Sequence, residues 1–351
     1  MGSLLSTLLA FGIAWLIGYF LVTSLWRMRP RDTADRLLAG AAAFGLGMGV
    51  VAVLDFLWVA AFGKASRGIV LADLAVLVLT VVARRLTRKA SPPVGGWPRG
   101  FGWFSGSVFL LFSAIALGIV ATILSRAPDG AWDAIAVWNM HARFFNAGGN
   151  GDWKALFDPL MEFTHPDYPP LIPACVARGW RYAGQAIPLV PMTLAFGFTF
   201  ALLALITGAV ASARGGNLGA LACAVLAASP IFLGTALSQY ADMPLAFFFL
   251  LAVALLHRAD QESEPHAGLH VLAGLAAGMA ALTKNEGSLF MVALGACCTC
   301  CSRARRGTEF GTWPGSDWAW LPRWVCCCST SPFLRRTTSS PDKPRIFGRS
   351  C

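Results

Sequence analysis

The sequence has few charged residues. Asp, Glu, Lys and Arg make up only 13% of the 351 residues, while apolar residues make up 56%. Soluble domains contain about 25% charged and about 45–50% apolar residues. The shortage of charge therefore excludes a soluble globular protein and predicts an all-α, polytopic membrane protein.

Three other signals are missing. No basic patch is interleaved with aromatic residues, so nucleic acid is not an expected partner, and the basic residues suit lipid headgroups instead. The N-terminus lacks the basic segment and small-residue cleavage site of a secretory signal, so residues 4–26 are expected to be a retained span. Only Cys175 and Cys223 precede residue 297, and seven of the eight later cysteines occur in adjacent runs. Zinc sites use pairs separated by two to four residues, so no metal site is predicted.

Apolar segments recur along most of the chain and predict its organisation. Residues 1–102 should hold the first spans and a cytoplasmic linker, residues 103–296 a transmembrane core, and residues 297–351 a tail rich in Cys, Arg and Pro. The predicted spans are residues 4–26, 37–62, 68–83, 103–124, 187–211, 218–237, 243–257 and 269–283, and a last one from residue 288.

One long polar stretch interrupts the core, at residues 126–182 within a loop predicted at 125–186. It carries six acids, five bases and two of the five histidines, and it lacks an apolar run long enough to cross a bilayer. Basic residues gather at 27–36 and again at 84–89, and such clusters favour the cytoplasmic side. Alternation of the spans then places the polar stretch outside the cytoplasm.

The same alternation brings polar residues from separate loops to one face of the membrane. We expect them either to form a functional site or to be polar only because loops contact water. They are Asp133, His141, Arg143, His165, Asp167, Tyr240, Asp242, Lys284 and Glu286.

Within the loop, apolar residues at three- and four-residue spacing predict a helix at the membrane interface. Asp133 lies at its start, so it either caps the helix or acts as a general base. The residues of the predicted apolar stripe are Trp132, Ile135, Trp138, Ala142 and Phe145.

The sequence THPDYPPLIP, residues 164–173, contains four prolines. Proline fixes φ and disfavours helix at the residue before it, so this segment should be rigid and extended. It would form either a binding wall beside His165 and Asp167 or only a stiff surface loop. A His-x-Asp pair can contribute to a divalent-cation site, and no other cofactor is predicted.

Two short motifs follow at predicted span ends, YADMP at 240–244 and KNEG at 284–287. Asp242 could cap the next helix. Lys284 is placed to hold a lipid-linked phosphate as a point charge. Alternatively, Lys284 only extends to the membrane interface or is neutralised by Glu286.

Together these motifs resemble the GT-C superfamily of integral membrane glycosyltransferases, in particular a bacterial branch that modifies lipopolysaccharide cores and related glycans. The resemblance covers about residues 103–296. It depends on an outer-loop acid followed by an aromatic and a basic residue, on HPDYPPL, on YADMPL, and on TKNEG at the end of a span rich in small residues. The residues of the first pattern are Asp133, Trp138 and Arg143.

The resemblance implies an enzyme of the bacterial inner membrane whose site faces the periplasm. The donor would be a polyprenyl-phosphate sugar, the acceptor a glycan or lipid, and the transfer inverting. Asp133 and Asp242 would be catalytic, and Lys284 would hold the donor phosphate. Other residues expected to bind substrate are Arg143, His165, Asp167, Tyr240 and Glu286.

Two departures and two alternatives accompany this interpretation. At the position of Asp133 the loop has a single acid, where many relatives have two acids side by side. Relatives also continue with further spans and often with an outer domain. The change of composition near residue 297 suggests a shifted reading frame, so the chain could be a non-catalytic, truncated remnant. Asp55 and Asp73, within apolar spans, motivate a polytopic transporter as the other alternative.

Overall fold

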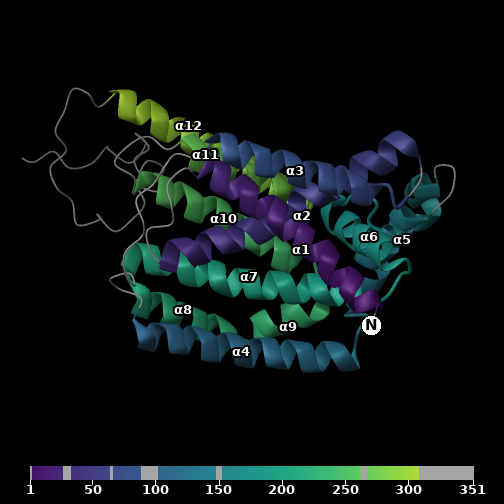
Figure 1. Ribbon diagram of the computed structural model, residues 1–351, viewed down its shortest axis with the longest axis horizontal. Coiled ribbons are helices and arrows are strands. Elements are labelled where there is room, and N and C mark those ends of the chain that lie inside the picture. Colours follow the sequence, from purple (N-terminus) through teal and green to yellow (C-terminus); the bar gives the residue numbers. More distant parts are fainter. Residues whose placement is uncertain are drawn as a thin grey trace, which may run out of the picture. The chain divides into compact units, whose positions relative to one another are not determined.

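The computed structural model describes residues 2–26, 33–63, 66–87, 102–147, 152–261 and 267–307. Within these ranges every regular element is a helix (Figure 1), which confirms the all-α prediction. The chain divides into two compact units, residues 1–291 and residues 292–351, and the first unit contains the whole polar loop.

Each predicted span contains helix. The first helices of the chain are α1 (Gly2–Leu25), α2 (Thr33–Phe62), α3 (Ile69–Thr87) and α4 (Trp103–Arg126). After the polar loop come α7 (Leu189–Arg214), α8 (Gly216–Ala227), α9 (Pro230–Ser238), α10 (Asp242–Asp260), α11 (Ala267–Ala281) and α12 (Asn285–Gly307).

In the part of the chain that the structure describes, five helices are long and apolar enough to cross a membrane: α1, α2, α4, α7 and α10. The pair α8 and α9, bent by 64° at a short break, gives a sixth if it counts as one span, and α11 is shorter. In Figure 1 this pair runs alongside α4. The predicted third span, α3, is not among the five, and its helix carries Asp73, Arg84 and Arg85.

Small residues and aromatic rings hold the helices together. A Cβ added at Gly47 would strike the backbone carbonyl of Ala14, so glycine allows α1 and α2 to touch backbone to backbone. Between α7 and α10, Phe198 lies edge-on to Phe247 and Phe248, with ring centroids 5.5 Å and 5.9 Å away. All three rings are fully buried. The core is therefore packed by close helix contacts and by an aromatic cluster.

Polar contacts mark the two ends of this helical unit. At one end, Arg258 forms a two-point ion pair with Asp35, at 2.8 Å and 3.2 Å. At the other end the long polar loop meets the turns at residues 238–242 and 282–287, through backbone bonds from Ala131 to Ser238 and from Leu171 to Leu282. The predicted convergence of loops on one face is thus confirmed for these three segments, whereas the side of the membrane stays a prediction.

The polar loop folds into short helices: η1 (Ala134–Trp138), α5 (Asn139–Asn146), η2 (Asp152–Phe157), η3 (Pro159–Thr164) and α6 (Leu171–Ala183). Helix α6 was not predicted, and it is buried over most of its length. The extended segment predicted at residues 164–173 is wrong at its end, because Pro173 lies in the first turn of α6. Proline is tolerated there since the first N–H groups of a helix have no intrahelical partner.

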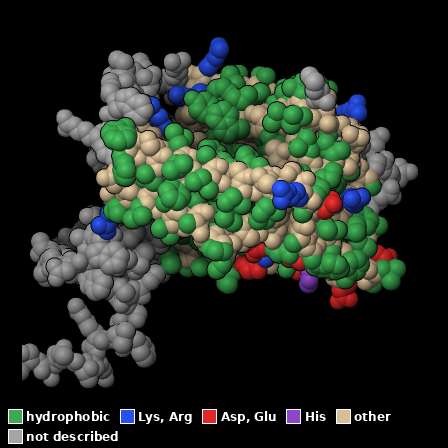
Figure 2. Space-filling model, turned by 90° about the horizontal axis from the view of Figure 1, so that it is seen from below, with side chains coloured by type: hydrophobic (Ala, Val, Ile, Leu, Met, Phe, Trp, Pro, Cys, Tyr) green, Lys and Arg blue, Asp and Glu red, His purple; other side chains and the backbone are tan. Residues whose placement is uncertain are grey.

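Figure 2 shows hydrophobic side chains spread over the side of the helices. Acidic and histidine side chains gather toward the end where α5 and α6 lie in Figure 1. This distribution is that of a helical bundle with an apolar flank and a polar end.

The predicted tail boundary at residue 297 does not coincide with the end of a helix. Helix α12 passes through Ala296 and continues to Gly307. The rest of the tail, residues 308–351, lies outside the described residues, as do Arg27, Arg29, Arg31, Arg88 and Lys89 of the basic clusters.

Candidate active site

Lys284 lies at the centre of the polar end, in the turn between α11 and α12. Its Nζ is 3.2 Å from Oδ1 of Asp242 and 3.6 Å from Oε1 of Glu286. The Lys284 side chain is only 14% exposed, while those of Asp242 and Glu286 are 49% and 59% exposed. A largely covered cation therefore faces two acids that solvent still reaches. These three residues form the Lys284 cluster.

The surroundings of Lys284 keep it charged. Burial lowers its pKa, but the carboxylates of Asp242 and Glu286, together with Tyr168, outweigh burial, and the net pKa is raised. Asp242 is the first residue of α10, where a negative charge is stabilised by the helix dipole. The predicted capping role of Asp242 is wrong, because the capping position is occupied by Ala241 and has no side-chain hydrogen bond.

A stack of rings forms the wall beside the ammonium group. Nζ of Lys284 lies 5.9 Å from the ring centroid of Tyr168. Tyr168 stacks on Trp138 at 5.3 Å with an interplanar angle of 8°, and His165 stacks on Tyr168 at 5.1 Å. His165 has a left-handed backbone, with φ 53°. His165 therefore adjoins the site by stacking on Tyr168 rather than by direct contact with Lys284.

Asp167 ties the same segment to α12. Its Oδ2 accepts a hydrogen bond of 2.8 Å from Nδ2 of Asn285, the residue after Lys284. The backbone N–H of Leu171 donates to the carbonyl of Leu282, at 3.0 Å, from the other side of the same turn. Asp167, predicted to bind substrate, therefore also fixes the turn that carries Lys284.

His141 is buried and serves the loop itself. Its Nε2 lies 3.2 Å from Oγ1 of Thr164, whose hydroxyl donates to the carbonyl of Met161. Because that proton is already used, Nε2 of His141 must be the donor and Oγ1 the acceptor. Burial lowers the pKa of His141 to about 4, so it is neutral at physiological pH. His141 joins α5 to η3 and does not reach the Lys284 cluster.

Asp133 and Arg143, also predicted for the site, form no hydrogen bond or ion pair with the Lys284 cluster within the described ranges. Asp133 is half-buried and, among the described residues, its carboxylate has no hydrogen-bond partner. Its predicted capping role is wrong, since it precedes η1 but its side chain forms no cap hydrogen bond. Arg143 is exposed on α5. The apolar stripe is only partly buried, because Trp132 and Ile135 are exposed.

The turn between α9 and α10 carries Gln239 and Tyr240. Gln239 has φ 56°, uncommon for a residue other than glycine, and its Nε2 donates to the carbonyl of Pro128 at 2.8 Å. Tyr240 lines a small cavity that Trp138 also lines. This turn therefore connects the start of the polar loop to Asp242. Across the described ranges, no three His, Cys, Asp or Glu side chains gather where they could hold a metal ion together.

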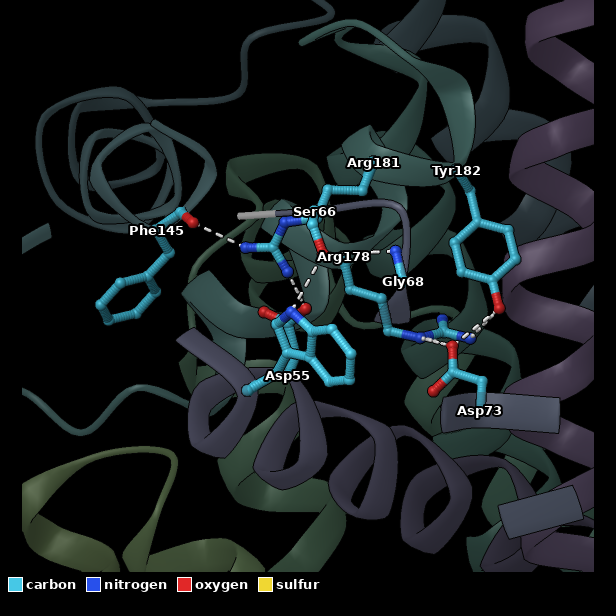
Figure 3. A network of polar contacts seen from close by, with 9 residues as sticks. Asp55, Ser66, Gly68, Asp73, Phe145, Arg178, Arg181 and Tyr182 are labelled. Carbon is cyan, nitrogen blue, oxygen red and sulfur yellow. Dashed lines mark hydrogen bonds and ion pairs between the residues drawn. The ribbon is translucent and has the colours of Figure 1, made fainter. Parts of the chain in front are cut away.

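Two acids within the apolar helices are paired with arginines of α6 (Figure 3). Arg178 donates to Asp73 at 2.7 Å and to the carbonyl of Ala10, while Arg181 contacts Asp55. All four charged side chains are buried. The charges of Asp55 and Asp73 thus attach α6 to α2 and α3.

Sequence reasoning did not identify Tyr168, Asn285 or these arginines. Arg178 and Arg181 lie three residues apart, hence on one face of a helix, in a segment that is otherwise largely apolar. Together with the two acids in the apolar spans, this spacing was a signal for buried ion pairs. Nothing in the sequence marks the ring stack beyond the presence of the aromatic residues themselves.

A comparison with known families adds an independent finding. Residues 183–308 match the family model described as dolichyl-phosphate-mannose-protein mannosyltransferase, so this segment is similar to membrane glycosyltransferases of the GT-C type. The match covers slightly more than a third of the chain and includes Tyr240, Asp242, Lys284 and Glu286. No curated protein and no solved structure matches the chain.

Proposed function

We propose that this protein is a membrane glycosyltransferase that moves a sugar from a polyprenyl-phosphate donor to a glycan or lipid acceptor of the cell envelope. The observation that carries the proposal is the contact of Lys284 with Asp242 at the polar end, inside the segment that matches the mannosyltransferase family. A covered cation next to a membrane is suited to a lipid-linked phosphate.

The chemistry assigns one step to each group. An acceptor hydroxyl oxygen attacks the anomeric carbon of the sugar, and the bond from that carbon to the phosphate oxygen breaks, so the lipid phosphate leaves with the electron pair. Lys284 stabilises the charge that develops on the phosphate. The hydroxyl proton passes to Asp133, whose carboxylate has no hydrogen-bond partner among the described residues. A single direct displacement inverts the anomeric carbon.

The site is proposed to face the outside of a bacterial plasma membrane. Arg84, Arg85, Arg214 and Arg258 lie in the last turns of α3, α7 and α10, and Asp242 begins α10 at the opposite end of that helix. Positive residues favour the cytoplasmic side, which supports this orientation.

A transporter is the less favoured alternative. Its motivation was the presence of Asp55 and Asp73 in apolar spans, and both acids are occupied by ion pairs with α6. Buried pairs of this kind can serve as structural links between helices.

The test is sugar transfer in membranes that contain the full chain. The donors are polyprenyl-phosphate mannose, glucose and galactose, and envelope glycans are compared with and without the gene. Asp133→Asn should abolish transfer while expression persists. Asp129→Asn, an exposed acid of the same loop, should leave transfer intact.

Three results would correct or overturn parts of the proposal. Full activity of Asp133→Asn removes that residue from the site but leaves the reaction. No transfer from any donor, with unchanged envelope glycans, overturns the function and favours a non-catalytic remnant. Uptake of a solute that is lost with Asp55→Asn would favour the transporter.

A further inference from the structure

A groove lies where α1, α2 and α7 pack against one another, and no residue of the Lys284 cluster lines it. Its volume is about 330 Å³, within the range of about 300–1,000 Å³ that is usual for small-molecule sites. All three helices are long and apolar enough to cross a membrane. A partner that reaches this groove from the side is therefore a component of the membrane.

Small residues form the floor of the groove, and aromatic rings form its rim. Ala201 and Ala204 on α7 are only 3% and 5% exposed, and a Cβ added at Gly40 on α2 would meet no atom within 4 Å. The rings at the rim are 37% to 44% exposed and come from α1 and α7: Trp15, Phe196 and Phe200. The groove is thus an apolar slot that is open along one side.

The length of the groove is close to the depth of one lipid leaflet. Arg36 lines one end and Phe44 the other, eight residues apart on α2, which is about 12 Å along a helix. Helix α7 runs antiparallel to α2 here, because Gly197 lies against the ring of Phe44 while Gly208 approaches the backbone of Ala34. The hydrocarbon core of a bilayer is about 30 Å thick, so one leaflet supplies about 15 Å.

Arg36 is an exposed cation at one end of this otherwise apolar slot. Within the described ranges its guanidinium forms no ion pair or hydrogen bond, and Asp35, the acid next to it in sequence, is bonded to Arg258. A guanidinium binds phosphate through a fork of N–H donors. An arginine at a span end commonly extends to the headgroups, but here the same groove also offers a place for an apolar chain.

We propose that this groove binds one anionic phospholipid, with its phosphate on Arg36 and one acyl chain along Gly40 toward Phe44. Arg36 lies at the end of the bundle that holds the Asp35–Arg258 pair, opposite the Lys284 cluster. A donor whose phosphate lies at Lys284 therefore does not place it on Arg36.

With the orientation proposed above, the lipid belongs to the cytoplasmic leaflet, where anionic headgroups attract basic residues. Because the lipid touches α1, α2 and α7 together, its binding stabilises the folded protein. The site does not depend on sugar transfer.

The first experiment counts bound lipids by native mass spectrometry of the full chain in a neutral detergent. Dioleoyl-phosphatidylglycerol should bind once, with saturation, and raise the temperature of unfolding. Dioleoyl-phosphatidylcholine, which has no net charge, and glycerol phosphate, which has no chain, should bind far more weakly. Arg36→Gln should lower the affinity for phosphatidylglycerol roughly 5- to 50-fold. The matched control is Arg214→Gln, an exposed cation at the same end of the bundle that does not line the groove.

The second experiment fills the groove. Gly40→Leu places a side chain in empty space on α2, so the variant should fold and insert normally but lose the bound phosphatidylglycerol. Gly12→Leu is the matched control, because Gly12 also has no neighbour within 4 Å of an added Cβ, lies on α1 and does not line the groove. Its lipid binding should equal that of the wild type. Should Arg36→Gln fail to fold, the comparison of these two variants decides alone.

Several outcomes would overturn the lipid site. Wild-type affinity for phosphatidylglycerol in Arg36→Gln or in Gly40→Leu shows that the lipid binds elsewhere. Equal affinity for phosphatidylcholine leaves only ordinary annular lipid. Displacement of phosphatidylglycerol by a lower concentration of polyprenyl phosphate assigns the groove to an isoprenoid chain, and a lipid-free dimer that Gly40→Leu dissociates assigns it to a second copy of the chain. None of these results bears on sugar transfer, so the proposed function is tested separately.

Discussion

The ammonium group of Lys284 lies 3.2 Å from the carboxylate of Asp242, across forty-two positions of sequence, at the point where α10 and α12 both begin. The backbone arrangement that makes this contact depends on the turn from Thr283 to Gly287. The same turn is bonded to the polar loop through Asn285 and Leu282. A single short segment therefore sets the position of the cation proposed to bind phosphate.

Replacing Lys284 by Met should nearly abolish sugar transfer. The developing phosphate charge would lose its cation, which we expect to reduce kcat/KM by about 10²- to 10³-fold. Lys284→Arg should retain part of the activity, because the charge stays while the geometry changes. Transfer rates in membranes, normalised to the amount of protein, provide the measurement. Lys154→Met, at an exposed position of the loop, serves as the control, and equal rates for the Lys284 and Lys154 variants would remove Lys284 from the site.

Asp242→Asn should shift the pH dependence of the reaction. Burial lowers the pKa of Lys284, and Asp242 is the strongest of the groups that raise it. Without that carboxylate, Lys284 should lose its proton at a lower pH, and the alkaline limb of the pH–rate profile should move toward neutrality. Profiles of the wild type and the variant with the same donor test this. An unmoved alkaline limb in an active Asp242→Asn variant would contradict it.

Gly287→Ala should misplace the cation without removing it. A Cβ at residue 287 would strike the backbone carbonyl of Ala280, so the turn between α11 and α12 would have to shift. We expect lower transfer activity with normal amounts of folded protein in the membrane. Gly278→Ala, on α11, is the matched control, because a Cβ there meets nothing within 4 Å. Comparable loss in both variants would show that the close approach at Gly287 is not the cause.

His141 should make the folded protein sensitive to mild acid. Its pKa falls from 6.5 to about 4 because of burial, so the unfolded chain takes up a proton at a higher pH than the folded chain does. Stability should therefore be full above about pH 7 and decline as the pH falls from 6.5 toward 4. Thermal unfolding of purified protein at several pH values measures this. His141→Gln should weaken the decline, and His165→Gln, at an exposed position, should preserve it.

The sequence allowed the helices to be predicted better than the site. Apolar runs located each long helix because helix length and hydropathy are local properties, but the break between α8 and α9 lies inside the single span predicted at residues 218–237 and was not predicted. The sequence predicted only that Lys284 and Asp242 lie on the same side of the membrane, and it did not predict their direct contact. Stacking of Trp138 on Tyr168 and the pairing of α6 with α2 and α3 depend on tertiary packing, which spacing alone does not encode.

Replacing Arg181 alone should destabilise the protein, whereas replacing Arg181 and its partner Asp55 together should cost less. Arg181→Met leaves the Asp55 carboxylate buried without a cation, which we expect to cost about 3–5 kcal/mol. Adding Asp55→Leu should restore much of the loss, because the pair is incompletely satisfied: Nε of Arg181 and Oδ2 of Asp55 have no partner. Thermal unfolding in detergent compares the single and double variants.

Arg143→Met, at an exposed position on α5, is the control for loss of a positive charge, and it should change stability by less than about 0.5 kcal/mol. The double variant also separates the two functions proposed from the sequence. A structural pair predicts that the stable double variant still transfers sugar, since neither residue touches the Lys284 cluster. A transport role for Asp55 predicts instead a stable protein whose solute uptake is lost. That result would return the two acids of the apolar helices to the centre of the mechanism.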